Sequence, residues 1–382
     1  MAIDKFGPNA FATGSVTSDA LATGTIATAD IADGSISTVK LANDAVTTAK
    51  VADTVNLGRR NLIINGDMQV AQRGSSFTYT NGTSGYKTMD RWYAAAFVSG
   101  GSLAISRQSA NNIGVDAESF LRATPSGSVS AGSATIYSEY RVENIKQFHN
   151  KQVTLSFYVK ASSSLTFQIR RHHYFGGAGS TEEYTSFSDV PVTTSWTRHT
   201  VTFPAQDFSS KSFSSGNYFG ILFYWSTDQG SNQLNDANID ITNVQLEFGD
   251  TATPFEHRSY GEELALCQRY YWTVLTDTAA QPLMGYGVAL SSTRCDFVYT
   301  LPVCMRTTPS VSNTRLALSS PGGTLYNKIN TDYSTGYHSA DQGSTVIRMG
   351  LDVSSGLTSN NSYFIRNQTG TGLSYIYADA EL

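Results

Sequence analysis

The first 58 residues contain a ten-residue repeat, and this repeat limits what the chain can fold into. Its four units are GSVTSDALAT (14–23), GTIATADIAD (24–33), GSISTVKLAN (34–43) and DAVTTAKVAD (44–53). Apolar residues recur at every fifth position, a period that fits neither an amphipathic helix nor a half-buried strand. One such chain buries too little apolar surface to offset the entropy that it loses on ordering.

We therefore predict that several copies of the chain wrap together along the repeat and form a fibrous segment. Each copy would place its fifth-position residues on a shared axis. The residues expected there are Val16, Leu21, Ile26, Ile31, Ile36, Leu41, Val46 and Val51. The alternative is that the Ala/Thr-rich segment is a linker without a fixed conformation.

From Arg59 onward, short aromatic or alternating runs indicate β-structure. They predict strands at 102–108, 134–142, 152–161, 165–175, 196–203, 218–225 and 238–248. Within 153–159, the alternate residues Val153, Leu155, Phe157 and Val159 are apolar and are expected to share one face of a strand. The run at 238–248 also predicts an apolar face, broken by one bulge-like step. Many short strands separated by Gly, Ser, Asn and Pro favour an antiparallel sandwich of jelly-roll type.

A second β-rich block begins near Tyr260. It opens with a short helical stretch at 261–268 and continues with six strand-like runs. We expect a mainly β chain in three parts: a fibrous repeat segment over 1–58, a jelly-roll over 59–258, and a smaller β-sandwich tip over 259–382.

The charge and the ends of the sequence exclude several classes of protein. A net charge of −5 argues against a nucleic-acid binder, which usually carries a basic stripe. No apolar run is long enough to span a membrane. The N-terminus lacks a basic start followed by an apolar core, so we expect no secretory signal. Only 15% of the residues are charged, which suits binding of neutral polysaccharide better than charge-steered protein binding.

We predict no metal site and no cofactor. Cys267, Cys295 and Cys304 have neither zinc-site spacing nor a disulfide framework, so free buried thiols are favoured, with a Cys295–Cys304 pair left open. Neighbouring residues on a strand point to opposite faces, so His172 and His173 of one chain cannot chelate one ion. Asp236 and Asp240 are candidates for a structural Ca²⁺, but turn-forming roles are favoured.

Catalysis is the less favoured interpretation, because phosphate-loop, zinc-protease and serine-hydrolase signatures are absent. Glycoside hydrolysis needs two carboxylates at a defined separation. The candidates by residue type are Glu182 with Glu183, Glu139 with Glu143, and Glu262 with Glu263. Solvated loop charge is the ordinary explanation of the first pair, and we predict that the protein is not an enzyme.

Aromatic residues among small polar ones suggest a recognition loop at 320–343. Rigid rings offer contact area to sugar rings, and the polar neighbours satisfy hydroxyls. The candidate glycan-binding residues are Tyr326, Tyr333, Tyr337 and His338. The equally weighted alternative is a long loop packed on another copy of the chain. The regular strand patterns around Trp92, Trp196 and Trp225 place these three residues in the core.

Several segments resemble phage tail fibres and related virion proteins. They are RRNLIINGDMQVAQRG (59–74), MDRWY (89–93), TLSFYVKAS (154–162), VQLEFGDTATPFEHRSYGEELALCQRYY (244–271) and LPVCMRTTPSVS (301–312). The AKVAD and VKLAN units resemble the repeats in the N-terminal parts of such fibres. The resemblance follows nearly the whole chain in order, is most specific over 244–271, and is least diagnostic over 313–382.

This resemblance implies a homotrimeric fibre with a jelly-roll like that of carbohydrate-binding modules, and it implies no catalytic activity. Its partners would be two further copies, phage tail proteins bound through the N-terminal segment, and host polysaccharide or lipopolysaccharide. The protein would be made in the host cytoplasm without a signal peptide and would be part of the virion tail. We expect multivalent, non-catalytic adhesion to host glycan. The alternatives are a structural virion adaptor and a polysaccharide depolymerase.

Overall fold

The structure is a computed structural model that forms two compact units, Met1–Leu57 and Gly58–Leu382. It describes residues 31–32, 35–36, 59–111, 113–127, 135–225, 237–276, 283–335, 345–367 and 374–382. Of the eight residues expected on the repeat axis, only Ile31 and Ile36 are described, and both are exposed, at 44% and 53%. The other axis residues lie outside the described residues, so the shared axis stays a prediction.

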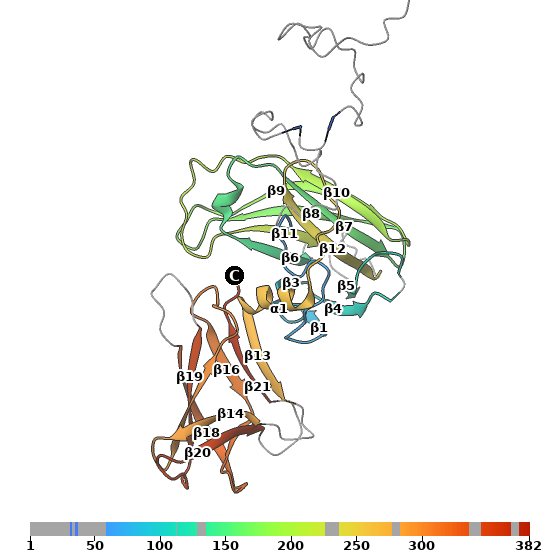
Figure 1. Cartoon of the computed structure of the whole chain (residues 1–382). Coiled ribbons are helices and arrows are strands. Elements are labelled where there is room, and N and C mark those ends of the chain that lie inside the picture. The colour runs from blue at the N-terminus through green and yellow to red at the C-terminus, as the bar shows by residue number, and fades with distance from the viewer. Residues whose placement is uncertain are drawn as a thin grey trace, which may run out of the picture. The chain divides into compact units, whose positions relative to one another are not determined.

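The first twelve strands form two six-stranded antiparallel sheets, which confirms the predicted sandwich of jelly-roll type (Figure 1). The first sheet has the order β1 (Ser76–Thr80), β4 (Gly101–Ser109), β5 (Ser119–Gly127), β12 (Ile239–Phe248), β7 (Val153–Ala161), β10 (Thr197–Phe203). The second has the order β2 (Thr83–Gly85), β3 (Trp92–Phe97), β6 (Thr135–Glu143), β11 (Tyr218–Tyr224), β8 (Leu165–Tyr174), β9 (Glu183–Val192). A short 3-10 helix, η5 (Ile145–Phe148), follows β6.

Alternating apolar residues of both sheets fill one core. Val153, Leu155, Phe157 and Val159 of β7 are all buried in it, as the alternation predicts. The predicted bulge in β12 is confirmed, because its pairing with β7 shifts between Thr242 and Gln245.

The prediction that all three tryptophans lie in the core holds for Trp92 and Trp225 only. Trp196 precedes β10 and is half-buried on the outer side of the sandwich. Its ring packs edge-to-face against Phe120 at 5.5 Å, and the Lys160 ammonium lies 5.3 Å from the ring centroid. The regular pattern around Trp196 therefore marked the start of a strand, while the side chain itself faces away from the core.

Helix α1 (Tyr260–Gln268) confirms the predicted helical stretch, and the Ser259 hydroxyl caps it by accepting from the Glu262 amide. Within the described part of the chain, nine strands surround the second core. Strands β13 (Tyr271–Thr276), β21 (Ser374–Asp379) and β16 (Ser310–Thr314) form a sheet. Strands β14 (Leu283–Ala289), β15 (Arg294–Thr300), β19 (Val346–Val353), β18 (Leu325–Thr335), β17 (Leu316–Ser319) and β20 (Ser362–Asn367) form a closed barrel, coloured orange to red in Figure 1.

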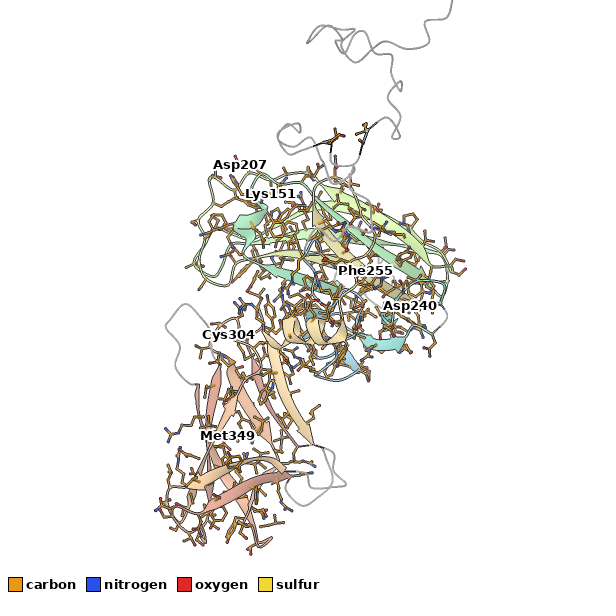
Figure 2. The ribbon with its side chains drawn as sticks, in the orientation of Figure 1. Lys151, Asp207, Asp240, Phe255, Cys304 and Met349 are labelled. Carbon is orange, nitrogen blue, oxygen red and sulfur yellow. The ribbon has the colours of Figure 1, made fainter. Side chains whose placement is uncertain are left out.

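The closed barrel differs in detail from the expected small sandwich. Because β14 pairs with both β15 and β20, the sheet has no free edge at this strand. Buried side chains such as Met349, labelled in Figure 2, fill the second core. A closed barrel removes the unpaired edges that a small open sandwich would leave exposed.

The segment 320–343 is not the continuous loop that its composition suggests. Strand β18 occupies Leu325–Thr335 and pairs with β17 on one side and β19 on the other. Its polar sequence lacks the apolar alternation that indicates a strand. The strand forms because its neighbours β17 and β19 in the barrel supply its hydrogen-bond partners.

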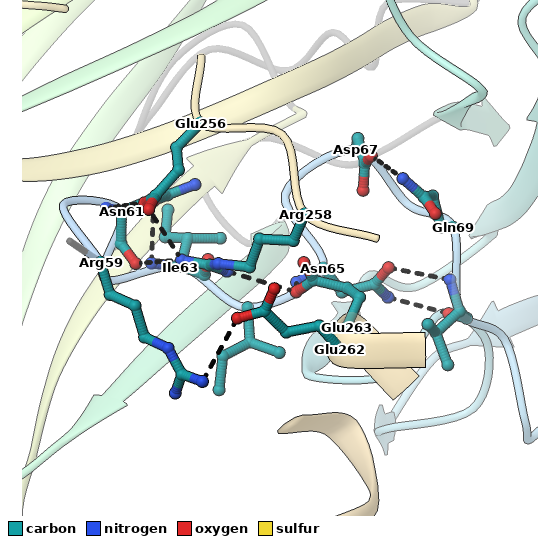
Figure 3. A network of polar contacts seen from close by, with 12 residues as sticks. Arg59, Asn61, Ile63, Asn65, Asp67, Gln69, Glu256, Arg258, Glu262 and Glu263 are labelled. Carbon is teal, nitrogen blue, oxygen red and sulfur yellow. Dashed lines mark hydrogen bonds and ion pairs between the residues drawn. The ribbon is translucent and has the colours of Figure 1, made fainter. Parts of the chain in front are cut away.

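The segment around 59–69 and the segment around 254–263 are tied together by buried polar contacts (Figure 3). The Asn61 carboxamide oxygen accepts from the amides of Ile63 and Leu246 at 2.9 and 3.1 Å. Arg258, only 5% exposed at its side chain, donates to the carbonyls of Asn61 and Ile63. The stretches 59–74 and 244–271 therefore contain residues that join the start of the jelly-roll to the segment leading into α1.

A second buried cluster joins the jelly-roll to the last residues of the chain described. Arg73 forms ion pairs with Asp90 at 3.0 Å, with Asp379 at 3.2 Å and with Glu381 at 3.3 Å. Arg91 also pairs with Glu381, and both side chains are at most 5% exposed. Charges buried this deeply are tolerated only when they are paired, so this cluster constrains how the two parts meet.

We expect the buried His173 to make the stability of the jelly-roll decrease at acidic pH. Its ring lies on the inner side of β8, packed edge-to-face on Phe208 at 5.1 Å, and its nearest carboxylate, Glu183, is 3.7 Å away. Burial, with the nearby Arg171 charge, lowers the pKa of His173 to about 4. Because the unfolded chain binds this proton more readily, stability is complete at neutral pH and is lost as pH falls from about 6.5 towards 4.

We expect His173→Phe to reduce that loss by about 1–2 kcal/mol between about pH 7 and about pH 4.5. Phenylalanine suits a site already surrounded by aromatic rings and cannot be protonated. Urea unfolding at the two pH values measures the difference, with His257→Phe, at an exposed histidine, as the control. Equal acid sensitivity of the wild type and His173→Phe would contradict the assignment.

Among the described residues, no helix is long and apolar enough to cross a membrane, and no group of three or more His, Cys, Asp or Glu could hold a metal ion. Cys267 and Cys295 are buried free thiols, and the half-buried Cys304 contacts the Met305 carbonyl oxygen through its Sγ at 3.7 Å. Asp240, labelled in Figure 2, is held by Arg122 through two hydrogen bonds of 2.7 and 2.8 Å. Asp236 lies outside the described residues.

Candidate functional site

The glycan-binding residues expected at 320–343 are only partly described. Tyr326 lies on β18, half-buried, with its ring edge-to-face against Tyr363 at 5.8 Å. Tyr333 is placed on β18 opposite Met349, but its side chain lies outside the described residues. Tyr337 and His338 are also outside them. Their proposed role therefore stays a prediction, although Tyr326 faces a packing contact rather than open solvent.

A different surface gathers aromatic and polar side chains. The outward positions of five neighbouring strands in the second sheet alternate with the core positions and form what we call the aromatic face. It comprises Tyr93 and Phe97 of β3, Tyr137, Glu139 and Arg141 of β6, Tyr218, Leu222 and Tyr224 of β11, Arg170, His172 and Tyr174 of β8, and Tyr184 of β9.

The strand register explains why these residues meet. Tyr224 of β11 lies opposite Tyr137 of β6, and Leu222 lies between Glu139 and Arg170 on its two neighbours. Because side chains on paired residues project from the same side of a sheet, the five strands present one continuous surface. Its inward counterparts, such as Ile136 and Phe223, are in the core.

A cavity of about 340 Å³ opens at one end of the aromatic face. Its walls include Phe97, Tyr137, Tyr184, Tyr224 and Arg170. Phe97 and Tyr184 are 44% and 46% exposed, so part of each ring is accessible at the cavity. An aromatic wall with one buried cation at its base is typical of a small-ligand site.

The tyrosines of this cavity are held in fixed positions by each other. The ring centroids of Tyr137 and Tyr224 are 5.6 Å apart, and those of Tyr93 and Tyr137 are 6.3 Å apart. The Arg170 guanidinium lies 4.5 Å from the Tyr224 centroid. Such pairs add to the energy of ring burial and leave little freedom to be lost when a ligand binds.

A polar centre lies beside the cavity. His172, which is buried, meets the Glu139 carboxylate through Nδ1 at 2.7 Å and the Glu182 carboxylate through Nε2 at 2.9 Å. Its ring stacks on Tyr184 at a centroid distance of 4.2 Å. These contacts fix both the histidine and the ring of Tyr184 at the edge of the cavity.

Gly220 leaves room for this polar centre. It lies opposite His172 on β8, and a Cβ atom at this position would come within 2.5 Å of the Glu139 carboxylate oxygen and 3.0 Å of the His172 Cβ. Any larger residue would therefore displace the side chains that form the floor of the face. The lack of a side chain here is a requirement of the site rather than of a turn.

The aromatic face continues beyond the polar centre. Arg141 forms an ion pair with Glu139 at 2.7 Å, and its guanidinium lies 4.0 Å from the Tyr93 centroid. Burial opposes the charge of Arg141, but Glu139 and nearby tyrosines raise its pKa above the ordinary value, so it stays charged. A further cavity of about 430 Å³ adjoins it, lined also by Tyr174, Tyr218 and Arg306.

Burial raises the pKa of the four tyrosines Tyr137, Tyr184, Tyr218 and Tyr224. Their hydroxyls therefore stay protonated at neutral pH and can donate as well as accept hydrogen bonds. The face thus offers apolar ring surface, hydroxyl groups, a carboxylate and guanidinium groups together. That combination matches the apolar C–H faces and hydroxyl groups of sugars.

The carboxylates singled out in the sequence are all engaged. Glu139 and Glu182 share His172, Glu183 pairs with Lys211, and Glu143 pairs with Arg269 at 3.0 Å. Glu262 pairs with Arg59 at 3.2 Å, and the buried Glu263 contacts Arg258 at 3.4 Å. These contacts account for the residues without assigning any of them a catalytic role.

Sequence reasoning located three of the five strands of this site, β6, β8 and β11, but missed β3, β9 and the site itself. The signal was present in the parity of two strands: Tyr137, Glu139 and Arg141 share one face of β6, and Tyr218, Gly220, Leu222 and Tyr224 share one face of β11. Both sets mix aromatic, charged and small residues, whereas the other parity is mostly apolar. Deciding that this mixed face is open needs the strand register, which the sequence does not provide.

No family model matches the chain, and no curated protein matches it. Among solved structures, it is similar to a family 11 carbohydrate-binding module of a cellulosomal cellulase from Clostridium thermocellum, at 13% identity and a TM-score of 0.29, over 50% of this chain and 97% of that one.

A xylan-binding domain from Paenibacillus barcinonensis is 14% identical with a TM-score of 0.26, over 46% of this chain and 95% of that one. The enzymatically active domain of tailspike protein 4 from bacteriophage CBA120 is 12% identical with a TM-score of 0.28, over 49% of this chain and 21% of that one. At these values the likeness carries no conclusion about what this chain binds.

Proposed function

We propose that the protein binds glycan on the aromatic face of the jelly-roll. The observation that carries the proposal is the cavity of about 340 Å³ in which partly exposed rings, among them Tyr184 and Phe97, surround the buried Arg170. Sugar rings stack their apolar faces on such side chains, while tyrosine hydroxyls and charged groups satisfy the sugar hydroxyls. This site replaces 320–343 as the leading candidate.

We also propose that this binding is non-catalytic. Hydrolysis of a glycosidic bond needs one carboxylic acid and one free carboxylate on either side of the bond. Glu139, the carboxylate at the centre of the face, is buried and is held by both His172 and Arg141. A group engaged in this way positions neighbouring side chains and is poorly placed to exchange protons with a substrate.

The wider role that we propose is adhesion of a phage tail fibre to host-surface glycan. The repeat of 1–58 and the motifs of 59–312 that resemble tail fibres support it. Three copies joined along the repeat would carry three aromatic faces, and linked weak sites gain avidity without tight single contacts. Ile31 and Ile36, both exposed in the single chain, would be covered by the other copies in such an assembly.

The glycan site is tested by binding of the full chain to an array of bacterial capsular polysaccharides and lipopolysaccharides. We expect binding to at least one glycan, weakened about tenfold or more by Tyr184→Ala, because an exposed ring that stacks on sugar would be removed. Tyr260→Ala, at another exposed tyrosine, serves as the control and should bind like the wild type. Equal binding by both variants would place the glycan elsewhere, and hydrolysis of a bound glycan would overturn the non-catalytic role.

The fibre assembly is tested by light scattering on the full chain and on residues 59–382. We expect the full chain to have about three times its 41.3 kDa mass. A trimeric 59–382 would show that the β-domains themselves hold the assembly. A full chain that stays monomeric at working concentration would contradict the fibre role and leave the repeat as a linker.

A further inference from the structure

A separate cavity of about 300 Å³ lies between the jelly-roll and the three-stranded sheet β13–β21–β16. Phe77 and Tyr86 line it from the jelly-roll, and Tyr271, Tyr375 and Tyr377 line it from the sheet. None of these residues belongs to the aromatic face. Five aromatic rings therefore line one cavity.

The tyrosines of the sheet form a row on the side away from the second core. Tyr377 lies opposite Thr273, and Tyr375 lies opposite Leu275, so these side chains share one face with Tyr271. The ring centroids of Tyr271 and Tyr377 are 5.7 Å apart, and those of Tyr377 and Tyr375 are 5.6 Å apart. The other face of the same strands carries Trp272 and Ile376, which belong to the core.

The cavity is held in a fixed shape by Arg73. Its guanidinium lies 3.6 Å from the Tyr271 centroid and is paired with three carboxylates, those of Asp90, Asp379 and Glu381. The Arg73 side chain is therefore held at one wall of the cavity by these contacts and does not fill the cavity. A ligand that enters this space need not order these side chains, which lowers the entropic cost of binding.

Exposed apolar groups lie at the rim. Leu275 is 54% exposed and Phe77 is 37% exposed, and both line the cavity. Phe77 also packs edge-to-face on Tyr79 at 4.9 Å, so its ring is fixed at the entrance. Apolar surface that is rigid and accessible is suited to the C–H faces of a ring.

The polar groups of the cavity supply donors and acceptors together. Lys87 is exposed, and within the described residues it has no ion-pair partner. The Asp379 side chain lines the same cavity, is 32% exposed and provides acceptor oxygens. Burial raises the pKa of Tyr271 to about 12, so its hydroxyl stays neutral and can donate.

These properties narrow the class of ligand. A purely apolar molecule would cover the Lys87 ammonium without offering it a hydrogen-bond partner, which is costly. A strongly anionic molecule would approach the Asp379 carboxylate. A neutral sugar satisfies both, because each hydroxyl donates and accepts while the ring stacks on a tyrosine. We propose that this cavity is a second saccharide-binding site, for a neutral sugar ring, independent of the aromatic face.

The test uses the full chain with all tyrosines replaced biosynthetically by 3-fluorotyrosine, followed by fluorine NMR. Single Tyr→Phe variants assign the signals of Tyr375, Tyr377 and, in the aromatic face, Tyr224. The probes are D-glucose, D-galactose, N-acetyl-D-glucosamine and L-rhamnose, each added in separate titrations. We expect at least one sugar to shift the Tyr375 and Tyr377 signals saturably.

Lys87→Met should weaken that response about tenfold or more, because it removes the charged hydrogen-bond donor of the cavity. Lys87 is exposed, so we expect the fold to be unchanged. Tyr286→Ser, at a tyrosine on the barrel that is 74% exposed, is the matched control and should respond like the wild type. If Tyr375 and Tyr377 respond to none of the four sugars, the second site is overturned. If they respond to protein dilution instead, a second copy of the chain covers the cavity, which also overturns it.

A response at Tyr224 alone would support the aromatic face and overturn the second site. A response at Tyr375 and Tyr377 alone would support the second site and count against sugar binding at the aromatic face. The two proposals therefore fail separately in one experiment.

Discussion

Replacing Arg91 by methionine should lower the free energy of unfolding by about 3–5 kcal/mol, because it breaks a buried ion pair and leaves part of its partner's charge uncompensated. Arg91 is 1% exposed at its side chain and Glu381 is 5% exposed. The guanidinium also lies 3.5 Å from the Tyr270 centroid and donates to the Arg141 carbonyl at 2.6 Å.

The backbone at Arg91 supports the same expectation. Its φ of 71° is in the left-handed region, where a non-glycine residue is unfavourable. A residue held in that conformation needs compensation from its side chain. The contacts with Glu381 and Tyr270 supply it, so we expect no gain from relieving the backbone strain to offset their loss.

Arg348→Met is the matched control for this prediction. Arg348 also pairs with a carboxylate, that of Asp296, but its side chain is 54% exposed. An exposed ion pair contributes about 0–1 kcal/mol, so this variant should unfold much like the wild type. Urea unfolding of both variants gives the two differences. If both variants lose a similarly small free energy of unfolding, the buried ion pairs of Arg91 do not hold the jelly-roll and the C-terminal residues together.

Much of the fold could be predicted because its signals are local. The alternation of β7, the bulge in β12 and the helix at 261–268 each depend on a few consecutive residues, and each is confirmed. The opposite orientation of His172 and His173 follows from strand geometry alone, and the structure places them on opposite sides of β8.

The parts that could not be predicted depend on neighbours far away in the sequence. Strand β18 exists because β17 and β19 supply its hydrogen bonds, so its polar composition suggested a loop. Closure of the barrel depends on pairing between β14 and β20, about eighty residues apart in the chain. No periodicity within either strand reports on that pairing.

The aromatic face was missed for a related reason. Tyr137 and Tyr140 are three residues apart on β6, yet Tyr140 is in the core and Tyr137 lines the cavity. Residue type alone does not distinguish a core tyrosine from a tyrosine that lines the cavity. Only the register, which sets Tyr224 beside Tyr137 and Arg170 beside Leu222, shows that the outward rings converge on one cavity.

That convergence leads to the largest effect that we expect on binding. The double variant Tyr137→Ala/Tyr224→Ala should weaken binding to the glycan found on the array by about a hundredfold, which corresponds to about 2.7 kcal/mol. Both rings line the cavity, and their loss also removes the aromatic partner of Arg170. Two stacking surfaces and one positioned cation would be lost together.

The single variants should show that the two rings act as a unit. Because their centroids are only 5.6 Å apart, removing one ring frees the other to move and weakens its contact with the sugar. Each single variant should therefore cost more than half of the loss seen in the double variant, so that the two losses sum to more than the total. Strictly additive losses would mean that the rings contact different parts of the glycan.

Stability must be separated from recognition in this experiment. Tyr137 and Tyr224 face outward, so their removal should leave the core formed by Ile136, Phe223 and Trp225 intact. The matched control is Tyr260→Ala/Tyr286→Ala, which removes two rings of comparable or greater exposure outside the face. Binding measured by calorimetry on variants that unfold at wild-type urea concentrations then reports the site alone. Retained binding by the Tyr137/Tyr224 double variant would remove the aromatic face as the glycan site, whatever the array shows for the wild type.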